Sequence, residues 1–491
     1  MLTVAIGPIH DASVDLHVQL DGRRDLSAQI FRQLRDAILD GRLRPGQRLP
    51  PTRELARRLS VSRNTAGVAY DELVAEGLVE GRVGAGSYVA SAVPVREAAR
   101  RAPAGAVHPR ARWRTPPVFA TGDAPAASFD FSVGRPDDTR FPLTTWRRLL
   151  ARELRESSRP FASYAHPAGH PALRAAIAAH VGVSRAVRAS ADDIVVTAGA
   201  QQAFDLIGRV LIDPGTGVAV EDPGYGRLRA LVSTLGANVL PVPVDDEGLV
   251  VEAIPARARL VYVTPSHQFP LGVTMSLRRR AALLEWAERR GAVVIEDDYD
   301  SEFRFGGRPL DPLQRLDRSG RVLYVGSFSK VLVPGLRLGF VVAPASLQPA
   351  LQAARQVADW HGDLAPQGAL ARFIESGGLA RHIRTVAREY EARYTRIAST
   401  IESRFAGVLR LVPAAAGLHV AATLDRRVHL TGAAIVRAAA ADGVRVAALS
   451  GFYAGQVDRD GLVLGFGGID MSRLDEGLER IVRVVMPRRR R

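Results

Sequence analysis

The sequence contains no cysteine and one lysine in 491 residues. The lack of cysteine excludes disulfides, thiolate metal sites and cysteine nucleophiles together. No run of roughly 18 uninterrupted apolar residues occurs, and a membrane-spanning helix needs about that many. The N-terminal segment has neither a basic start nor a long apolar run, so we expect a cytoplasmic protein.

The single lysine is Lys330, and arginine supplies all the other basic residues behind a formal net charge of +15. Arginine suffices wherever only a fixed positive charge is needed. A lysine amine can also lose its proton and attack a carbonyl carbon to form a Schiff base, which arginine cannot do near neutral pH. Lys330 is therefore a candidate nucleophile. The alternative is a surface lysine retained by chance.

The length and the hydrophobic content of 47% exceed what one core normally holds, so we expect two globular units of unequal size. Residues 20–91 are predicted to form the smaller unit. Residues 92–127 shift to alanine, proline and arginine without periodicity, which is typical of a flexible basic linker. Residues 128–491 are predicted to form a large α/β domain.

Three helices and a hairpin are predicted in the smaller unit. Apolar residues at helical spacing over 26–38 favour a helix that stops at Gly41. Thr52 is suited to cap a second helix, and Ser62 a third. The segment LVEGRVGAGSYVA then has two short apolar runs around a glycine turn, which is the shape of a DNA-binding wing.

Donor side chains lie at the exposed start of the third predicted helix, where a recognition helix meets base edges and phosphates. The stretch GRLRPGQRLPPTRELARRLSVSRNTAGVAYDELVAEGLVEGRVGAGSYV closely resembles the GntR-type winged helix-turn-helix. The resemblance implies binding to double-stranded promoter DNA through Arg53, Arg63, Asn64, Thr65, Arg82 and Gly86. For each of these the alternative is a solvated side chain or an ordinary cap. That alternative applies most readily to Arg44, Arg57 and Arg58.

Short apolar runs alternate with helical stretches beyond residue 128. Because these runs lack polar alternation, they predict a sheet covered by helices on both faces. In such sheets ligands lie beyond the ends of strands. The predicted strands are Ile194–Thr197, Val218–Val220, Leu260–Val263, Val293–Ile295, Val322–Val325 and Leu338–Val342.

Polar segments follow three of these strands. In TAGAQQA, the residues Gly199, Ala200 and Gln201 open a helix whose first N–H groups could hold a phosphate, although many strand-to-helix turns look the same. In VVIEDDYDSEFRF, acidic residues follow an apolar strand, and a carboxylate buried there needs a partner.

The third segment, VGSFSKVLVPGLRLGF, contains the lysine. Ser327 and Ser329 supply hydroxyl groups, and Arg337 supplies a fork of donors suited to a phosphate. The three segments in this order resemble the fold-type I aminotransferases, which use pyridoxal 5'-phosphate (PLP). Their junction to a GntR-type head resembles the MocR branch of transcription regulators.

The resemblance implies a set of cofactor contacts. Lys330 would form the Schiff base with PLP, Asp297 would bind the pyridine nitrogen and Tyr299 the ring hydroxyl. Ser327 and Arg337 would bind the phosphate. Asp298 or Asp300 could exchange roles with Asp297.

Two tyrosines complete the implied site. Tyr225, in EDPGYGR, resembles the aromatic residue that stacks on the cofactor ring. Tyr164, in YAHPAGHPALR, resembles the tyrosine that reaches the phosphate held by the partner subunit of a homodimer. The alternative for each is a core tyrosine with a bonded hydroxyl group.

Three departures from working aminotransferases bear on catalysis. Val463, in GLVLGF, stands where those enzymes carry the arginine that holds the substrate carboxylate. SHQFPLG replaces their NPxG segment, and His166 stands where aspartate is more common. Arg227 could supply a substitute anchor for an effector, or it could be an exposed helix arginine.

Two functions therefore remain open. In the first, the large domain senses PLP, or an amine or amino acid bound to it, and regulates DNA binding with little or no catalysis. In the second, it is an active PLP-dependent aminotransferase with a secondary role at DNA. Loss of the carboxylate anchor favours the first, because positioning supplies a large share of catalysis.

Overall fold

The computed structural model divides into two compact units, Met1–Pro109 and Arg110–Arg491. It describes residues 18–22, 24–82, 86–90, 107–114, 127–156, 163–305 and 310–486. The expected linker over 92–127 lies outside the described residues, except for 107–114 and 127. No described helix is long and apolar enough to cross a membrane.

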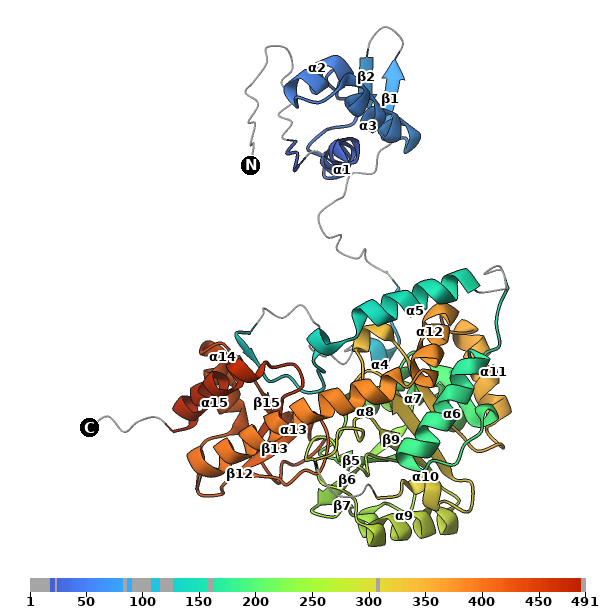
Figure 1. The fold of residues 1–491 in the computed structure, drawn as a ribbon, viewed down its shortest axis with the longest axis vertical. Coiled ribbons are helices and arrows are strands. Elements are labelled where there is room, and N and C mark those ends of the chain that lie inside the picture. The colour runs from blue at the N-terminus through green and yellow to red at the C-terminus, as the bar shows by residue number, and fades with distance from the viewer. Residues whose placement is uncertain are drawn as a thin grey trace, which may run out of the picture. The chain divides into compact units, whose positions relative to one another are not determined.

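The smaller unit has the predicted order of elements (Figure 1). It consists of α1 (Leu26–Leu39), α2 (Thr52–Arg58), α3 (Arg63–Ala75), β1 (Val79–Arg82) and β2 (Gly86–Val89). The expected cap of the second helix is wrong: α2 begins at Thr52 itself, and Pro51 occupies the capping position. The fixed φ of Pro51, −57°, lets the helix start directly after it.

Helix α3 is held by the cap and the apolar stripe that the sequence predicts. The Ser62 Oγ accepts a hydrogen bond from the Thr65 N–H at 3.0 Å, which satisfies one of the donors left free at a helix start. Ala66, Ala69, Tyr70 and Leu73 are all buried in the core of this unit. The exposed start of α3 is thereby fixed against α1 and α2.

The large unit is built on an eight-stranded sheet in the order β4-β11-β10-β9-β8-β5-β6-β7. Strand β11 runs antiparallel to both of its neighbours, and the pairs from β10 to β6 are parallel. The strands are β4 (Ile194–Thr197), β5 (Gly217–Asp222), β6 (Asn238–Asp245), β7 (Gly248–Leu249), β8 (Ala258–Val263), β9 (Val293–Asp298), β10 (Val322–Ser327) and β11 (Gly339–Val342).

Helices cover both faces of this sheet. Along β8, Leu260 and Tyr262 belong to one apolar cluster, whereas Val261 and Val263 belong to another. The first cluster includes side chains of α7 (Ala200–Leu211), α8 (Gly226–Thr234) and α11 (Gln348–Asp359). The second includes side chains of α9 (Leu277–Arg290). Since neighbouring strand residues point to opposite faces, the double cover explains the unbroken apolar runs.

The C-terminal part of the unit adds a four-stranded sheet in the order β12-β13-β16-β15. Its strands are β12 (Leu409–Leu411), β13 (His419–Leu424), β15 (Ala447–Ala448) and β16 (Gly461–Gly465), and the short helix η5 (Leu449–Phe452) follows β15. Helices α13 (Gly378–Arg404), α14 (Gly432–Ala441) and α15 (Met471–Val485) belong to the same part.

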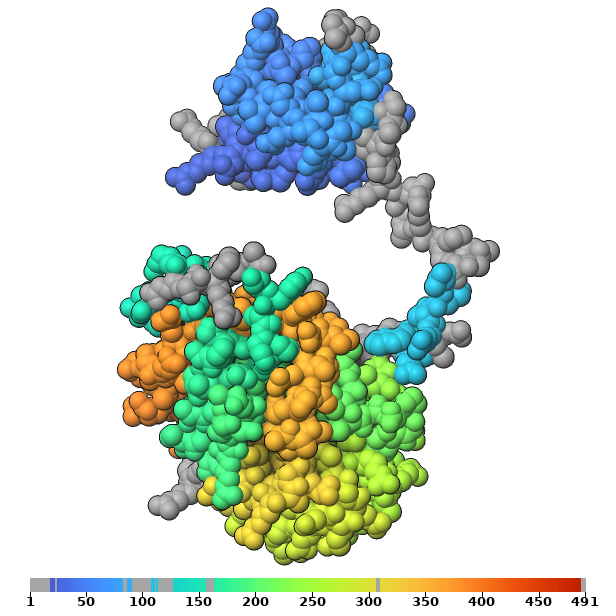
Figure 2. All heavy atoms as spheres, turned by 90° about the vertical axis from the view of Figure 1, so that its right-hand side faces the viewer, coloured from blue at the N-terminus to red at the C-terminus, as the bar shows by residue number. Residues whose placement is uncertain are grey.

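Segments far apart in sequence also meet near the start of the large unit. Helices α5 (Leu143–Glu156) and α6 (Pro171–Arg185) pack against α12 (Leu364–Glu375). In Figure 2 this region is a surface of green and orange segments lying side by side. The last pair of strands, β3 (Phe129–Asp130) and β14 (Val444–Arg445), joins the beginning of the unit to its end in parallel.

Candidate functional site

The residues expected to contact DNA lie on α2, α3 and the β-hairpin. Arg53, Arg63, Asn64, Arg82 and Gly86 are exposed. Thr65 is half-buried, and its hydroxyl group lies 2.8 Å from the Ser62 Oγ. The structure thus presents five of the six at the surface of the small unit.

Arg82 is held at the base of the hairpin turn. Its Nη2 donates to the Glu80 carboxylate at 2.8 Å, and its guanidinium lies 4.5 Å from the centre of the Tyr88 ring. Gly86 has a φ of +110°, and a Cβ there would lie 3.4 Å from the Nε of Arg48. A side chain at position 86 would therefore strain the hairpin beside Arg48.

A pocket of about 740 Å³ opens in the large unit at the ends of the sheet strands. It brings together most of the cofactor residues that the sequence singled out, from segments as far apart as 200 and 337. The expected residues that line it are Ala200, Gln201, Tyr225, Arg227, Asp297, Tyr299, Ser327, Ser329, Lys330 and Arg337. Gly199 lies directly behind Arg337: a Cβ at Gly199 would be 3.2 Å from the Arg337 Nη1.

Lys330 is half-buried and lines this pocket, three residues after the end of β10. Its Nζ donates to the Gly134 carbonyl oxygen at 2.6 Å. Burial lowers the pKa of Lys330, opposed by the charges of Asp300 and Asp297. The amine is therefore closer to the neutral, nucleophilic form than an exposed lysine would be.

Asp297, the next-to-last residue of strand β9, has one carboxylate oxygen bonded and one without a partner among the described residues. Its Oδ2 accepts a hydrogen bond from the Tyr262 hydroxyl at 2.6 Å. Its Oδ1 is buried and has no hydrogen-bond partner among the described residues. Burial raises the pKa of Asp297 to about 7. A buried acceptor of this kind is suited to a donor that the described residues do not supply.

The two neighbouring acids have other partners. The Asp298 Oδ2 accepts hydrogen bonds from Arg185 and from the Tyr324 hydroxyl, both at 2.7 Å, and Asp298 does not line the pocket. Asp300 does line it, but its carboxylate is engaged by His267 Nδ1 at 3.0 Å. Geometry therefore favours Asp297 over both alternatives as the acceptor for an incoming donor.

A second part of the pocket lining, around the start of α7, is rich in hydrogen-bond donors. Arg337 Nη2 donates to the Ala198 carbonyl oxygen, and Gly199 precedes the first turn with a φ of +88°. The Ser327 Oγ accepts a hydrogen bond from the Ser329 N–H at 3.1 Å. A guanidinium, a hydroxyl group and the N–H groups of a helix start together suit a phosphate.

Two tyrosines, Tyr225 and Tyr299, also line the pocket. The Tyr225 ring meets the Phe269 ring edge-on, with centroids 5.8 Å apart, and burial raises the pKa of Tyr225 to about 12. The Tyr299 hydroxyl donates to the His267 carbonyl oxygen at 2.9 Å. Both rings line the pocket, so each is available to a flat ligand.

Tyr164 does not line the pocket of its own chain. It is 72% exposed and stacks on Trp360 with ring centroids 4.2 Å apart. His166 bonds locally, since its Nδ1 accepts from the Ala168 N–H at 3.2 Å. Neither residue contributes to the pocket as the single chain builds it.

Sequence reasoning missed several lining residues, including Tyr262, Phe269, His419 and Phe452. Tyr262 was detectable in principle, because a tyrosine inside an apolar strand needs a partner for its hydroxyl group. His419 comes from β13, in the last quarter of the chain, and no local pattern marks it. Val463 is completely buried on β16 and is not among the lining residues.

Comparison with known proteins gives both parts of the chain a family. Residues 127–481 match the family "Aminotransferase class I and II", and residues 26–89 match "Bacterial regulatory proteins, gntR family". The chain therefore belongs to the class of DNA-binding regulators in which a GntR-type winged helix is fused to an aminotransferase-like domain of the PLP-binding fold. Within that class it is a regulator of the MocR type.

The relatives cover nearly the whole chain. The "Probable rhizopine catabolism regulatory protein MocR" of Rhizobium meliloti is 38% identical over 96% of this chain and 94% of that protein. The "HTH-type pyridoxine biosynthesis transcriptional regulator PdxR" of Corynebacterium glutamicum is 32% identical over 94% of this chain and 96% of that protein.

Solved structures match the large unit. The kynurenine aminotransferase of Pyrococcus horikoshii, in complex with PMP, superposes with a TM-score of 0.68 and 28% identity, covering 73% of this chain and 90% of that one. LysN, the α-aminoadipate aminotransferase of Thermus thermophilus, complexed with N-(5'-phosphopyridoxyl)-L-leucine, has a TM-score of 0.67 and 30% identity. It covers 73% of this chain and 92% of that one.

Proposed function

We propose that this protein is a cytoplasmic, homodimeric transcription regulator that holds PLP at Lys330 and changes its DNA affinity when PLP, or an amine bound to it, occupies the pocket. The observation that carries the proposal is the unpartnered, buried Asp297 Oδ1 in the pocket that also contains Lys330. The protonated ring nitrogen of PLP is the donor that this oxygen lacks.

The remaining residues fit the rest of the cofactor. Lys330 offers the amine for covalent attachment, and Tyr262 fixes the orientation of the Asp297 carboxylate. Arg337, the hydroxyl groups of Ser327 and Ser329, and the helix start at Gly199, Ala200 and Gln201 offer a cradle for the phosphate. Tyr225 and Tyr299 lie where they can contact the ring. When bound, PLP supplies a conjugated ring that stabilises negative charge on groups attached at its aldehyde carbon.

The exposed Tyr164–Trp360 pair supports the homodimer. An aromatic pair that lies outside its own pocket is available to a second copy of the chain, as the aminotransferase resemblance implies. Two DNA-binding units would then belong to one dimer. A ligand that binds one arrangement of the dimer better than another shifts the population between them.

Sensing is favoured over transamination by the nature of the lining. Arg227 and Arg337 are the arginines that line the pocket among the described residues, and the C-terminal part contributes neither of them. Arg227 is therefore the candidate arginine to contact the effector. The alternative, an active aminotransferase, needs a carboxylate held firmly beside Lys330, and buried Val463 cannot do so.

The test compares operator binding by wild type and Lys330→Ala at fixed salt, with and without PLP. We expect the ligand to change operator affinity in the wild type only, while both proteins bind nonspecific DNA equally. A panel of amino acids mixed with the PLP-loaded protein then separates the two functions, because an enzyme accumulates a keto acid. An unchanged ligand response in Lys330→Ala would contradict sensing through Lys330.

A further inference from the structure

The C-terminal part of the chain contributes a wall to the pocket that carries no positive charge among the described residues. This wall consists of His419 from β13 together with Gly451 and Phe452 from η5. In the neighbouring strand β16, Val463 points into an apolar cluster instead of toward the pocket. The side chain that decides the chemistry of this wall is therefore His419.

His419 has a defined tautomer. Its Nε2 lies 3.1 Å from the Pro270 carbonyl oxygen, which can only accept, so Nε2 carries the hydrogen. Burial, with the neighbouring His267 and Lys330, lowers the pKa of His419 well below its usual value, and the ring is neutral. The Nδ1 is then a bare lone pair, and it is buried without a partner among the described residues.

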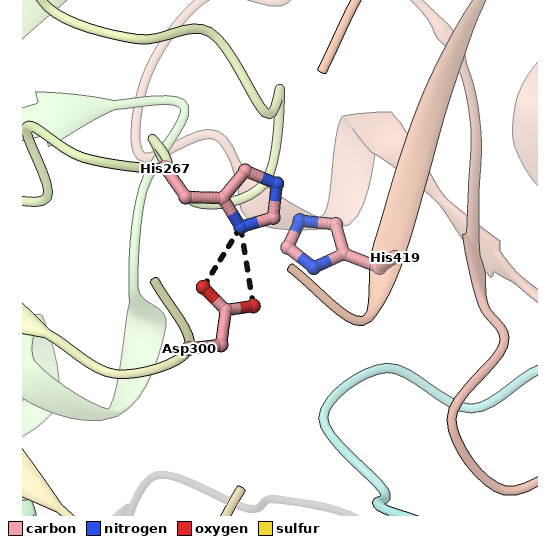
Figure 3. Close-up of side chains that lie close together, drawn as sticks. All are labelled: His267, Asp300 and His419. Atoms are coloured by element: carbon pink, nitrogen blue, oxygen red, sulfur yellow. Dashed lines mark hydrogen bonds and ion pairs between the residues drawn. The ribbon is translucent and has the colours of Figure 1, made fainter. Parts of the chain in front are cut away.

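Asp300 adds negative charge beside this lone pair. Figure 3 shows Asp300, His267 and His419 meeting from three separate segments, and one polar atom of each lies within 4.8 Å of the others. Asp300 and His419 line the pocket, whereas His267 does not. Burial lowers the pKa of Lys330, and the carboxylate of Asp300 opposes this more than that of Asp297 does. We call Asp300 and His419 the acceptor pair.

The other charged residues that line the pocket have contacts of their own or lie on other segments than the acceptor pair. Arg337 is committed to the start of α7, and Asp297 to Tyr262. Arg227 enters from α8, and Lys330 holds the reacting amine. A carboxylate placed against the acceptor pair would meet a second carboxylate and a lone pair in a poorly solvated space, which is unfavourable. A hydroxyl group there would donate its one hydrogen to either member of the pair, and an ammonium group would donate to both.

We propose that the acceptor pair selects the class of effector. It favours primary amines that carry a hydroxyl group on the carbon next to the amine-bearing carbon over the α-amino acids that carry a carboxylate there. This inference rests on the proposed function, because it concerns what binds beside PLP at Lys330. The amine would approach Lys330 while the hydroxyl group donates to His419 Nδ1 or to Asp300. Aminotransferases bind a substrate carboxylate next to the reacting amine, whereas this pocket would favour a hydroxyl group in that position.

A divalent cation is a competing occupant of the same cluster. It would use the same unpartnered His419 Nδ1 and would also have to compete for the Asp300 carboxylate, which accepts hydrogen bonds from His267 Nδ1 at 3.0 Å and from the Leu418 N–H at 3.2 Å. A hydroxyl donor leaves the hydrogen bonds of Asp300 in place, since it needs only the unpartnered His419 Nδ1. The structure therefore favours the donor ligand.

The experiment uses the PLP-loaded full chain and a pair of ligands that differ only at one end, alanine and 2-aminopropan-1-ol. Binding is followed by the visible spectrum of the bound cofactor and independently by calorimetry. We expect the amino alcohol to bind at least about tenfold more tightly than alanine, a difference of one decade in Kd. Equal affinities, a preference for alanine, or no response to either ligand would overturn the inference.

Two variants test the residues. His419→Phe keeps a ring of similar shape but loses the acceptor, so affinity for the amino alcohol should fall toward that of alanine. Asp300→Asn removes the negative charge, so alanine should bind better. The matched control is His180→Phe, a half-buried histidine of α6 outside the pocket lining, which should leave both affinities unchanged. Selectivity that survives both pocket variants contradicts the assignment.

The failure of the inference can be told from failure of the proposed function. If PLP gives a Lys330-dependent spectrum but the ligand preference is absent, only the acceptor pair is misassigned. If no Lys330-dependent spectrum forms at all, the proposed function fails and the inference with it. Stoichiometric Zn²⁺ binding to the PLP-loaded wild type that is lost in His419→Phe would overturn the donor ligand in favour of a cation.

Discussion

Lys330 and Asp297 acquire their properties from burial in one pocket. The amine pKa falls and the carboxyl pKa rises, because in each case the low-dielectric surroundings disfavour the charged form. A cofactor with an electrophilic carbon can bond to the neutral Lys330 amine, and its protonated ring nitrogen can stabilise the charged Asp297 carboxylate. The two residues are therefore the most informative places for substitution.

Lys330→Arg should abolish the visible absorbance of bound PLP while leaving the protein folded. The substitution preserves the positive charge but removes the amine that can bond to an aldehyde. Absorbance spectra before and after dialysis, with circular dichroism as the folding control, give the measurement. A visible band that persists in the dialysed arginine variant would show that another residue holds the cofactor.

Asp297 should make the cofactor-free protein less stable as pH rises. Its pKa is 3.8 in the unfolded reference and about 7 in the folded chain, so the folded state binds the extra proton between these values. Stability contributed by this proton is complete below about pH 4 and is lost as pH rises through about 7, with a slope of at most about 1.4 kcal/mol per pH unit.

Thermal unfolding of the cofactor-free protein between pH 5 and pH 8 tests the sign, taking the window from the two pKa values of Asp297. Asp297→Asn should make the fall of stability with pH less steep, because the contribution of one titrating carboxyl group is removed. Wild type loaded with PLP should also show a flatter decline, because a protonated ring nitrogen would then face the carboxylate. A steeper decline in Asp297→Asn than in wild type would contradict the sign.

At the scale of elements, six of the eight strands of the large sheet follow from apolar runs in the sequence. Strand β6 was missed because Pro241 and Pro243 interrupt its pattern, and proline within a run argues against a strand. In the structure β6 tolerates both prolines between parallel β5 and the two-residue strand β7. The sheet neighbours, which the local pattern cannot reveal, decide this element.

Helix α3 offers an element-scale prediction. Ser62→Ala removes the side-chain acceptor for the Thr65 N–H and should destabilise the small unit by about 1 kcal/mol. Hydrogen exchange of residues 63–75 in the full chain should speed up accordingly, and operator affinity should fall with it. Ser27→Ala, inside α1, is the matched serine control and should change neither. Unaltered exchange in Ser62→Ala would mean that the cap contributes nothing to α3.

At the scale of the whole molecule, the two units Met1–Pro109 and Arg110–Arg491 have separate cores, and the segment 92–127 stays a predicted linker. If the large units dimerise as proposed, each operator is met by two tethered DNA-binding units. Some 35 linker residues have a random-coil span of roughly 30–35 Å, comparable to one turn of DNA between half-sites. Binding of the second unit then occurs at a high effective concentration.

Truncation to residues 1–92 should therefore leave a folded but weak DNA binder. On a promoter with two half-sites, its affinity should be lower than that of the full chain by a factor of about 10² or more, because the tether is lost. On a single half-site the two proteins should bind alike. Electrophoretic shifts at one salt concentration give both comparisons, and equal affinity on the two-site promoter would argue against a tethering dimer.

The sequence by itself determined the two-part organisation and the third helix with its Ser62 cap, and it singled out Lys330 as a candidate nucleophile, because these depend on local periodicity and on residue type. It also left Asp297, Asp298 and Asp300 interchangeable. Only the tertiary structure separated them, since the partners Tyr262, Arg185 and His267 come from other segments. His419 likewise reaches the pocket only because β13 packs beside it, a long-range contact that no local pattern encodes.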